Sequence, residues 1–419
     1  MTPFAFSVLF IGFVAATLLV RLWLASRHVR HVLAHRHAVP AEFAEKIPLS
    51  AHQKAADYTV ARTHLSLVHL AVNTAVLMGF TLLGGLQWLS VHIHRLTGPG
   101  MTYQIALIAA FALISGLIEL PFDYHRQFKL EARFGFNKMT IKLFVSDLVK
   151  QTLIGAVIGL PLLWVILSLM GKAGDLWWLY AWVVWTGFQL LMLVIFPTVI
   201  QPLFNKFTPL QDESLRARIE SLMSRVGFAS KGLFVMDGSK RSAHGNAYFS
   251  GFGAAKRIVF FDTLLARLAP SEIEAVLAHE LGHFKLKHII KRIGVMFAMS
   301  LGFLALLGYL KTQVWFYTGL GVDPMLLGNN DAMALLLFML TLPVFTFLLS
   351  PIASLTSRKH EFEADAFAAK HTDPQDLVSA LVKLYEDNAS TLTPDPVHSA
   401  FYDSHPPASV RIHHLLAQQ

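Results

Sequence analysis

The 419-residue chain has no cysteine and few charged residues. The absence of cysteine excludes disulfides, thiolate zinc sites and thiol catalysis. Charged residues make up 15% of the chain, whereas soluble domains average about 25%. Hydrophobic residues make up 54%, and the mean hydropathy is +0.50. The composition therefore predicts a membrane protein.

Seven apolar stretches are long enough to cross a bilayer, whose core of about 30 Å needs roughly 20 helical residues. They comprise residues 4–25, 65–89, 103–120, 152–170, 176–200, 293–310 and 332–355. The first stretch lacks the basic flank and the cleavage site of a signal peptide, so we interpret it as a membrane anchor. The predicted fold is mainly α-helical, with seven transmembrane helices.

The positive charges favour one side of this predicted bundle. Of the 35 Lys and Arg residues, 27 lie in the connections after the first, third and fifth spans and in the C-terminal tail. The other connections carry only Arg95, Lys172 and Lys311. The positive-inside rule therefore predicts an N-terminus outside and a C-terminus in the cytoplasm. Charge spread over membrane-flanking loops also argues against nucleic acid as a partner.

Polar side chains interrupt two of the spans. His69 and Asn73 lie in the second span, and Glu119 and Asp123 close the third. Polar groups at membrane depth usually face a protein interior or a water-filled cavity. Two interpretations stay open at this point, namely interfacial or helix–helix hydrogen bonding and a water-filled chamber inside the bundle.

The pattern divides the chain into four segments. Residues 1–200 carry five spans, 201–290 form a cytosolic α/β insert, 291–355 carry the last two spans, and 356–419 form a cytosolic tail. Within the insert, periodicity predicts a helix over 212–226 and strands at 233–236, 246–249 and 257–261. Gly251-Phe252-Gly253 separates the last two strands as a turn, and a helix begins at Pro270.

The motif His279-Glu280-Leu281-Gly282-His283 lies on that helix. Histidines four residues apart share one helical face, where both can bind a tetrahedral zinc ion. Glu280 can reach a zinc-bound water and act as general base, because zinc lowers the pKa of that water to about 7. The alternative is an ordinary amphipathic helix with surface His and Glu residues.

A catalytic zinc ion usually has three protein ligands and one open position. Leu286 and Ile289 stand where the metzincin pattern needs Gly and His, which excludes that class. His288 lies nine residues after His279, so we predict that it points to the opposite face, toward solvent or the lipid interface.

The acidic cluster after the last span offers the third ligand. Glu361 and Asp365 are four residues apart and share one helical face, whereas Glu363 points elsewhere and is rejected. We predict that Glu361 binds the metal and that Asp365 supports a ligating histidine. The alternative is a charged helix cap at the membrane surface.

Four histidines near the first span, at positions 28, 31, 35 and 37, have partly helical spacing. No carboxylate is interleaved with them, so a second metal site is disfavoured. We predict a basic helix that contacts lipid headgroups.

Several motifs resemble the type I CAAX prenyl protease family, integral-membrane zinc metallopeptidases of peptidase family M48. In chain order they are EARFGFNK at 131–138, PLFNKFTPL at 202–210, DGSKRSAHGNAYF at 237–249, HELGH at 279–283, SR at 357–358 with EFEAD at 361–365, and SHPP at 404–407 with Arg411. The heat-shock-associated metalloproteases of the same clan are shorter with fewer spans, so the seven spans favour the CAAX type.

The resemblance implies a seven-helix bundle around a water-filled chamber, with one zinc ion per chain held by His279, His283 and Glu361 on the cytosolic side. It also implies that Asn246, Ala247 and Tyr248 form a strand edge that binds substrate in extended form, where main-chain hydrogen bonds give affinity without narrow specificity. His405 and Arg411 resemble residues beside the metal, where a cation or N–H group stabilises the oxyanion.

The predicted activity is zinc-dependent peptide hydrolysis, which resembles removal of the C-terminal tripeptide after a prenylated cysteine. The expected partners are a peptide or protein substrate, lipidated in the CAAX case, and membrane lipid. We expect a functional monomer in a bacterial inner membrane. Two other functions stay open: a broad-specificity protease for membrane-protein quality control, and a channel or transporter with structural zinc.

Overall fold

The computed structural model describes residues 1–230, 232–250, 257–326, 328 and 330–417. The helices before the sheet are α1 (Pro3–Ala34), α2 (Leu49–Phe80), α3 (Gly85–Thr97), α4 (Met101–His125), α5 (Ile141–Lys172) and α6 (Trp177–Ile195). The strands are β1 (Phe207–Pro209), β2 (Leu233–Met236), β3 (Ala247–Ser250) and β4 (Arg257–Phe261), with α7 (Glu213–Arg225) between β1 and β2. The later helices are α8 (Asp262–Arg267), α9 (Pro270–Lys285), α10 (His288–Leu310), α11 (Val314–Thr318), α12 (Asp331–Thr346), α13 (Ser350–His371), α14 (Pro374–Asp387), α15 (Pro396–Tyr402) and α16 (Ala408–Leu416).

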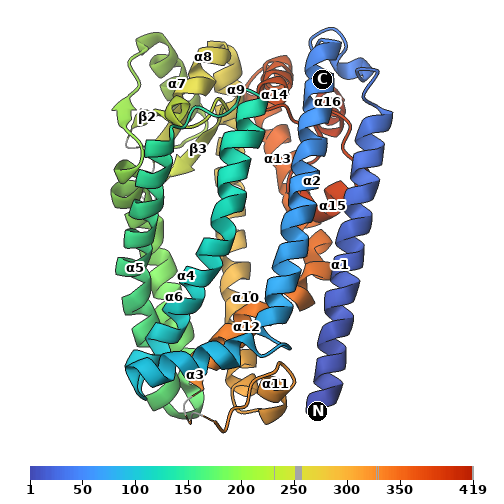
Figure 1. Cartoon of the computed structure of the whole chain (residues 1–419). Helices are drawn as coiled ribbons and strands as arrows, with labels where there is room; N and C mark the ends of the chain where they lie inside the picture. The colour runs from blue at the N-terminus through green and yellow to red at the C-terminus, as the bar shows by residue number, and fades with distance from the viewer. Residues whose placement is uncertain (231, 251–256, 327, 329, 418–419) are drawn as a thin grey trace.

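Seven helical segments among the described residues are long and apolar enough to cross a membrane, which confirms the predicted number of spans. They run side by side between the end that holds the N-terminus and the end that holds the sheet (Figure 1). The predicted limits of the second span were wrong, because α2 ends at Phe80 and α3 is a separate helix. Gly84, the residue before α3, adopts φ +78°, a left-handed conformation that is incompatible with one continuous helix.

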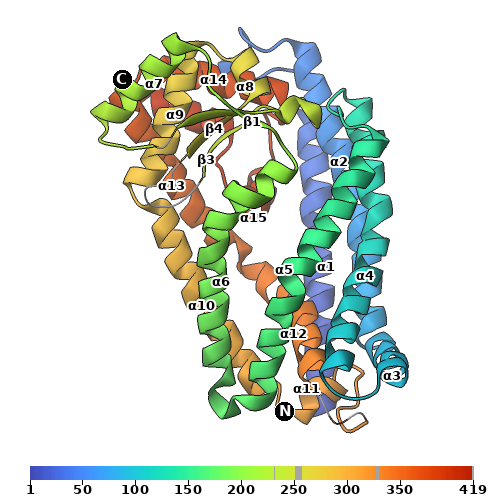
Figure 2. The same cartoon turned by 90° about the vertical axis from the view of Figure 1, so that its left-hand side faces the viewer.

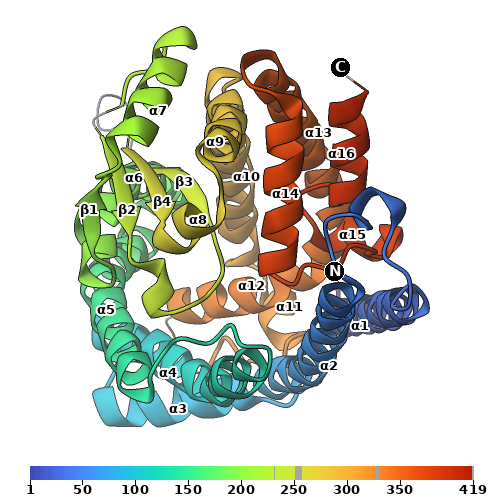
Figure 3. The same cartoon turned by 90° about the horizontal axis from the view of Figure 1, so that it is seen from above.

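The spans form a ring when they are seen from above (Figure 3). We call α1, α2, α4, α5, α6, α10 and α12 the membrane ring. None of the residues in the most hydrophobic 18-residue window of α2 is buried, and only 6% of the corresponding window of α10 is. A helix inside a solid bundle buries a continuous stripe of side chains. The low burial therefore fits a ring of helices around an enclosed space.

A four-stranded sheet lies above α5 and α6 (Figure 2). Its strand order is β1-β2-β4-β3, in which β2 and β4 are parallel and the outer pairs are antiparallel. The predicted strands at 233–236 and 257–261 are confirmed, whereas the one expected at 246–249 occupies Ala247–Ser250. The three-residue strand β1 was not predicted. The expected turn at Gly251-Phe252-Gly253 lies outside the described residues.

The sheet, α7–α9, α14–α16 and the C-terminal half of α13 form what we call the cap. Its core joins Ile219 and Leu222 of α7 to Ile258 and Phe260 of β4. The predicted helix over 212–226 is α7, and these apolar residues give it one buried face. The core holds α9 against the sheet and thereby fixes the helix that carries HELGH.

Helix α9 also packs closely against α13, which continues from the last span into the cap. A Cβ atom at Gly282 would lie 3.0 Å from the Cα of Ala364 and 3.1 Å from the Cβ of Phe367. Only a glycine allows the two helix backbones to approach so closely. This approach brings residues 361–365 to the histidines of α9.

Candidate metal centre

Three predicted ligands converge between α9 and α13. The Nε2 atoms of His279 and His283 are 3.2 Å apart. Glu361 places Oε2 3.5 Å from the first of these nitrogens and Oε1 3.3 Å from the second. The three side chains offer atoms that all lie within 4.8 Å of one another, as a metal site requires.

The chemistry of this cluster fits a cation. Glu361 is only 4% exposed, and its Oε2 atom is buried without a hydrogen-bond partner among the described residues. A buried carboxylate oxygen without a partner is unfavourable unless another group satisfies it. Two imidazoles and one carboxylate with an open fourth position form the donor set of a catalytic zinc site.

Asp365 forms a hydrogen bond with Nδ1 of His279, the ring nitrogen that is not in the ligand cluster. The Nδ1–H group of His279 donates to Asp365 Oδ1 at 2.8 Å, which leaves Nε2 facing the ligand cluster. Arg411 makes two hydrogen bonds to the same carboxylate, at 2.6 and 2.9 Å. Asp365 is 0% exposed and Arg411 6%, so solvent does not replace these contacts.

The same contacts set the charge of two groups. Burial lowers the pKa of His279, but the carboxylates of Asp365 and Glu361 outweigh it and raise that pKa to about 9. Burial likewise opposes the charged form of Arg411, yet its bond to Asp365 raises the pKa of the guanidinium above its ordinary value. Metal ligands must be deprotonated, so metal binding to His279 displaces a proton.

The other predicted catalytic side chains lie around this cluster. Glu280 follows His279 on α9 and is half-buried. His405 has an exposed side chain, with Nε2 3.3 Å from Glu361 Oε1. Arg411 reaches Glu361 as well, at 3.5 Å, although its hydrogen bonds go to Asp365. The structure thus places His405 and Arg411 beside Glu361, and Glu280 directly follows His279 on α9, while the role of each stays a prediction.

His288 contradicts the sequence expectation. We predicted that His288 faces solvent or lipid, but it is only 4% exposed and its Nδ1 lies 3.0 Å from His283 Nδ1. Glu363 lies outside the ligand cluster, as predicted, and its Oε2 accepts a hydrogen bond from His288 Nε2 at 2.8 Å. His288 departs from the expectation because α9 ends at Lys285, so helical geometry does not extend to residue 288.

The predicted substrate strand lies at an edge of the sheet. Among the described residues β3 pairs with β4 alone, and it packs against α9, which carries the two histidines. Asn246 precedes the strand and is exposed, while Ala247 and Tyr248 are half-buried within it. This arrangement is compatible with an added strand, and the binding role of the three residues stays a prediction.

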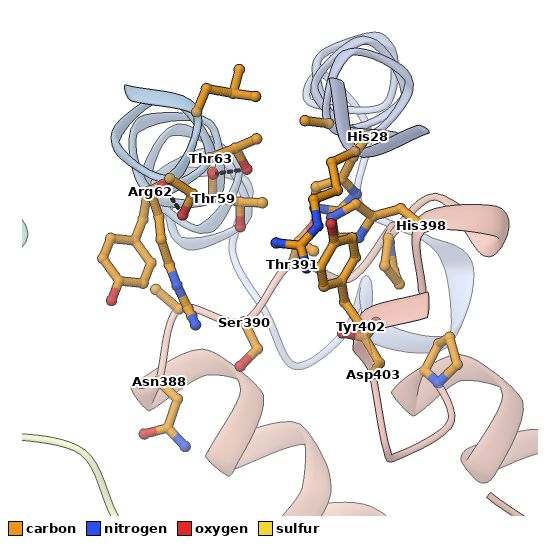
Figure 4. Close-up of a pocket in the computed structure, with 18 of the residues that line it drawn as sticks. His28, Thr59, Arg62, Thr63, Asn388, Ser390, Thr391, His398, Tyr402 and Asp403 are labelled. Atoms are coloured by element: carbon orange, nitrogen blue, oxygen red, sulfur yellow. Dashed lines mark hydrogen bonds between the residues drawn. The ribbon is translucent and has the colours of Figure 1, made fainter. Parts of the chain in front are cut away.

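A polar pocket adjoins the cluster. It has a volume of about 760 Å³ and lies between α1, α2 and the segment that leads from α14 to His405. Figure 4 shows Thr59 and Arg62 of α2, with Asn388 and Ser390 below them and Tyr402 to their right. Since His405 lines the pocket and also contacts Glu361, the pocket extends to the metal centre.

His28 also lines this pocket, which corrects the expected lipid contact at that position. It is 5% exposed and stacks on His398, with ring centroids 3.9 Å apart. Its Nδ1 accepts a hydrogen bond from the backbone N–H of Asp395. His28 therefore anchors α1 to the C-terminal segment.

Known proteins share the sequence family and the fold. Residues 28–206 match the family described as CAAX prenyl protease N-terminal, five membrane helices, and residues 209–419 match Peptidase family M48. The chain belongs to the M48 family. Its members are metallopeptidases, and the chain is accordingly a multi-pass membrane metalloendopeptidase.

Relatives of the M48 family match nearly the whole chain. The CAAX prenyl protease 1 homolog of Arabidopsis thaliana is 36% identical over 86% of each chain. CAAX prenyl protease 1 of Saccharomyces cerevisiae is 35% identical over 89% of this chain and 87% of its own. The crystal structure of S. mikatae Ste24p superposes with a TM-score of 0.91 at 32% identity, covering 98% of this chain and 99% of that one. The chambered membrane bundle expected from the sequence is therefore confirmed.

Proposed function

We propose that this M48 peptidase cleaves the peptide bond after a prenylated cysteine and releases the C-terminal tripeptide. The observation that supports it most directly is the convergence of His279, His283 and Glu361 beside a pocket that opens into the membrane ring. A lipidated peptide needs a polar active site next to a space at the depth of the membrane. The cap and the membrane ring meet at the pocket beside the ligand cluster. The names of the relatives supply the CAAX specificity.

We further propose that the metal is zinc, one ion per chain, held by these three side chains. Zinc bound there supplies a Lewis acid and lowers the pKa of a water molecule to about 7. Glu280 accepts the proton of the attacking water and passes it to the leaving amine. Asp365 keeps the lone pair of His279 Nε2 directed at the ligand cluster, and Arg411 holds Asp365 in place.

The other predicted site residues bind the substrate and stabilise the negative charge that develops on its carbonyl oxygen. The peptide lies along the edge formed by Asn246, Ala247 and Tyr248, where main-chain hydrogen bonds hold it in extended form. His405 and Arg411 are the proposed oxyanion donors. His405 is the better placed of the two, because its side chain is exposed while Arg411 is buried and bonded to Asp365.

The catalytic cap is proposed to face the cytoplasm, with the N-terminus outside, in a bacterial inner membrane and as a monomer. The N-terminus and the cap lie at opposite ends of the ring (Figure 1), as seven spans require. Because the chain has no cysteine, single cysteines placed at Thr2 and Gln418 report their side directly through an impermeant thiol reagent. Labelling of position 2 but not of 418 in intact cells supports this orientation, and the reverse pattern contradicts it.

The deciding experiment is cleavage of a farnesylated CAAX peptide by the purified full chain, with and without chelator, beside Glu280→Gln. Cleavage that needs both zinc and Glu280 supports the proposal. Glu280-dependent cleavage of unprenylated protein without cleavage of this peptide would instead indicate a broad-specificity protease. Bound zinc without activity on either substrate would indicate structural zinc.

A further inference from the structure

A break between two helices places His288 behind His283. Helix α9 ends at Lys285, and α10 begins at His288. Lys287 between them adopts φ +59°, a left-handed conformation that side chains other than glycine rarely take. The turn reverses the direction expected from helical spacing and brings His288 next to His283, with the two ring planes inclined by 72°.

The two hydrogen bonds of His288 allow one consistent assignment of donors and acceptors. If His283 binds the metal through Nε2, its Nδ1 carries the ring proton and donates to His288 Nδ1, 3.0 Å away. His288 must then carry its own proton on Nε2, which donates to Glu363 Oε2 at 2.8 Å. The series Glu363–His288–His283 thus satisfies every ring nitrogen with a single choice of tautomers.

We infer that His288 and Glu363 are positioning residues that fix the tautomer and ring orientation of His283. They match the role of Asp365 on the other histidine, His279. An outer hydrogen bond of this kind orients a metal ligand and raises its basicity. The inference rests on the proposed ligand set, in which His283 binds through Nε2.

The two positioning residues, His288 and Glu363, differ in how far they are buried. His288 is only 4% exposed, so water does not replace it behind His283. The Glu363 side chain is 37% exposed and lies 3.9 Å from Lys359, which is itself exposed. Loss of His288 should therefore weaken metal binding more than neutralisation of Glu363.

A second metal site is the competing use of the same residues. His288, His360 and Glu363 offer atoms within 4.8 Å of one another. However, the rings of His288 and His360 are stacked, with centroids 4.0 Å apart and planes inclined by 12°. Imidazole lone pairs lie in the ring plane, so two stacked rings do not aim at one ion. His360 therefore packs against His288, and the stacked geometry disfavours a metal ion between the two rings.

The test measures zinc affinity of the full-length purified protein by competition with a chromophoric chelator. His288→Ala should weaken zinc binding about 10- to 100-fold, as loss of an outer partner typically does. Glu363→Gln should weaken it less, and His288→Gln, which keeps one donor and one acceptor, should restore part of the loss. His360→Phe is the matched control: it keeps the ring stack, removes the nitrogens and should leave the zinc affinity unchanged.

A spectroscopic readout separates positioning from folding. The visible bands of the cobalt-substituted protein should shift in His288→Ala and Glu363→Gln, because both change the ligand strength of His283. Thermal unfolding of the metal-free Glu363→Gln protein should match wild type. If His288→Ala does not fold, Glu363→Gln decides the question by itself.

Two results would overturn the inference. Unchanged zinc affinity and cobalt spectra in both His288→Ala and Glu363→Gln would show that the series does not act on His283. Two zinc ions in wild type and one in His360→Phe would assign these residues to a second metal site. A failure of the ligand set itself is seen separately, as undiminished zinc binding by His283→Ala.

Discussion

The cap and the membrane ring treat polar groups in opposite ways. In the cap, Asp365 is fully buried between His279 and Arg411, and each of its oxygens has a partner. In the ring, His69 and Glu119 form an ion pair at 2.7 Å while 36% and 41% of their side chains stay accessible. Chemistry needs side chains fixed by a packed surround. A water-filled chamber needs polar side chains that line an open space, so ion pairs such as His69–Glu119 stay accessible to solvent.

Substitution of Glu280 should have the largest effect on the cap. Glu280→Gln removes the proposed general base, and peptide cleavage should fall roughly 10²- to 10⁴-fold. Zinc affinity should not change, because Glu280 is outside the ligand cluster. Steady-state cleavage together with chelator competition checks both halves of this prediction. A large loss of zinc in the variant would show that Glu280 acts on the site as a whole.

Asp365→Ala should have the second largest effect, and this effect is on metal binding. It frees the Nδ1 atom of His279 and leaves Arg411 buried without its bidentate partner. We expect zinc affinity to fall about 10- to 100-fold. Glu119→Gln is the matched ring variant, because it also removes a carboxylate from a histidine. An equal loss of zinc affinity in both variants would erase the distinction between cap and ring.

Gly282→Ala tests how closely the cap is packed. The added Cβ would lie 3.0 Å from the backbone of Ala364, so α13 must move by a few tenths of an ångström. Overpacking of this kind destabilises by about 1–3 kcal/mol, whereas alanine regains about 1 kcal/mol of helix propensity. We expect a lower unfolding temperature and weaker zinc binding. Gly294→Ala on α10 is the control, since nothing lies within 4 Å of its added Cβ.

Glu272 predicts a pH dependence of cap stability. Burial raises its pKa, but the bonds from Lys383, Ser379 and the backbone of Ala269 outweigh that and lower the pKa below its ordinary value. Its stabilisation is therefore complete above the unfolded pKa of about 4.3 and is lost as the pH falls through the folded value. Glu272→Gln should destabilise by about 2 kcal/mol at pH 7. Thermal unfolding at pH 7 and pH 4 should show this difference shrinking at the lower pH.

The smallest effect is expected in the ring. His69→Ala breaks the pair with Glu119, but partly accessible pairs contribute only about 0–1 kcal/mol. The unfolding temperature should change little. A shift as large as that of Gly282→Ala would mean that the ring is as tightly constrained as the cap.

Local patterns carried most of the site prediction. The spacing of His279 and His283, and of Glu361 and Asp365, follows helical geometry, and both helices form as expected. The meeting of these two helices was not deducible from spacing, and the positions of His405 and Arg411 were expected only from a resemblance. His288 was misplaced because nothing in the residue type of Lys287 indicates a left-handed backbone.

The sequence by itself determined that the chain crosses a membrane seven times and carries a metallopeptidase motif. Both follow from interactions within one helix, namely hydrophobic length and 3.6-residue periodicity. The tertiary structure alone decided that His288 turns back to His283, and it brought together Glu361 and the two histidines, whose meeting helical spacing could not give. These contacts join segments far apart in the chain or separated by a helix break, and packing between elements, as at Gly282, sets their positions.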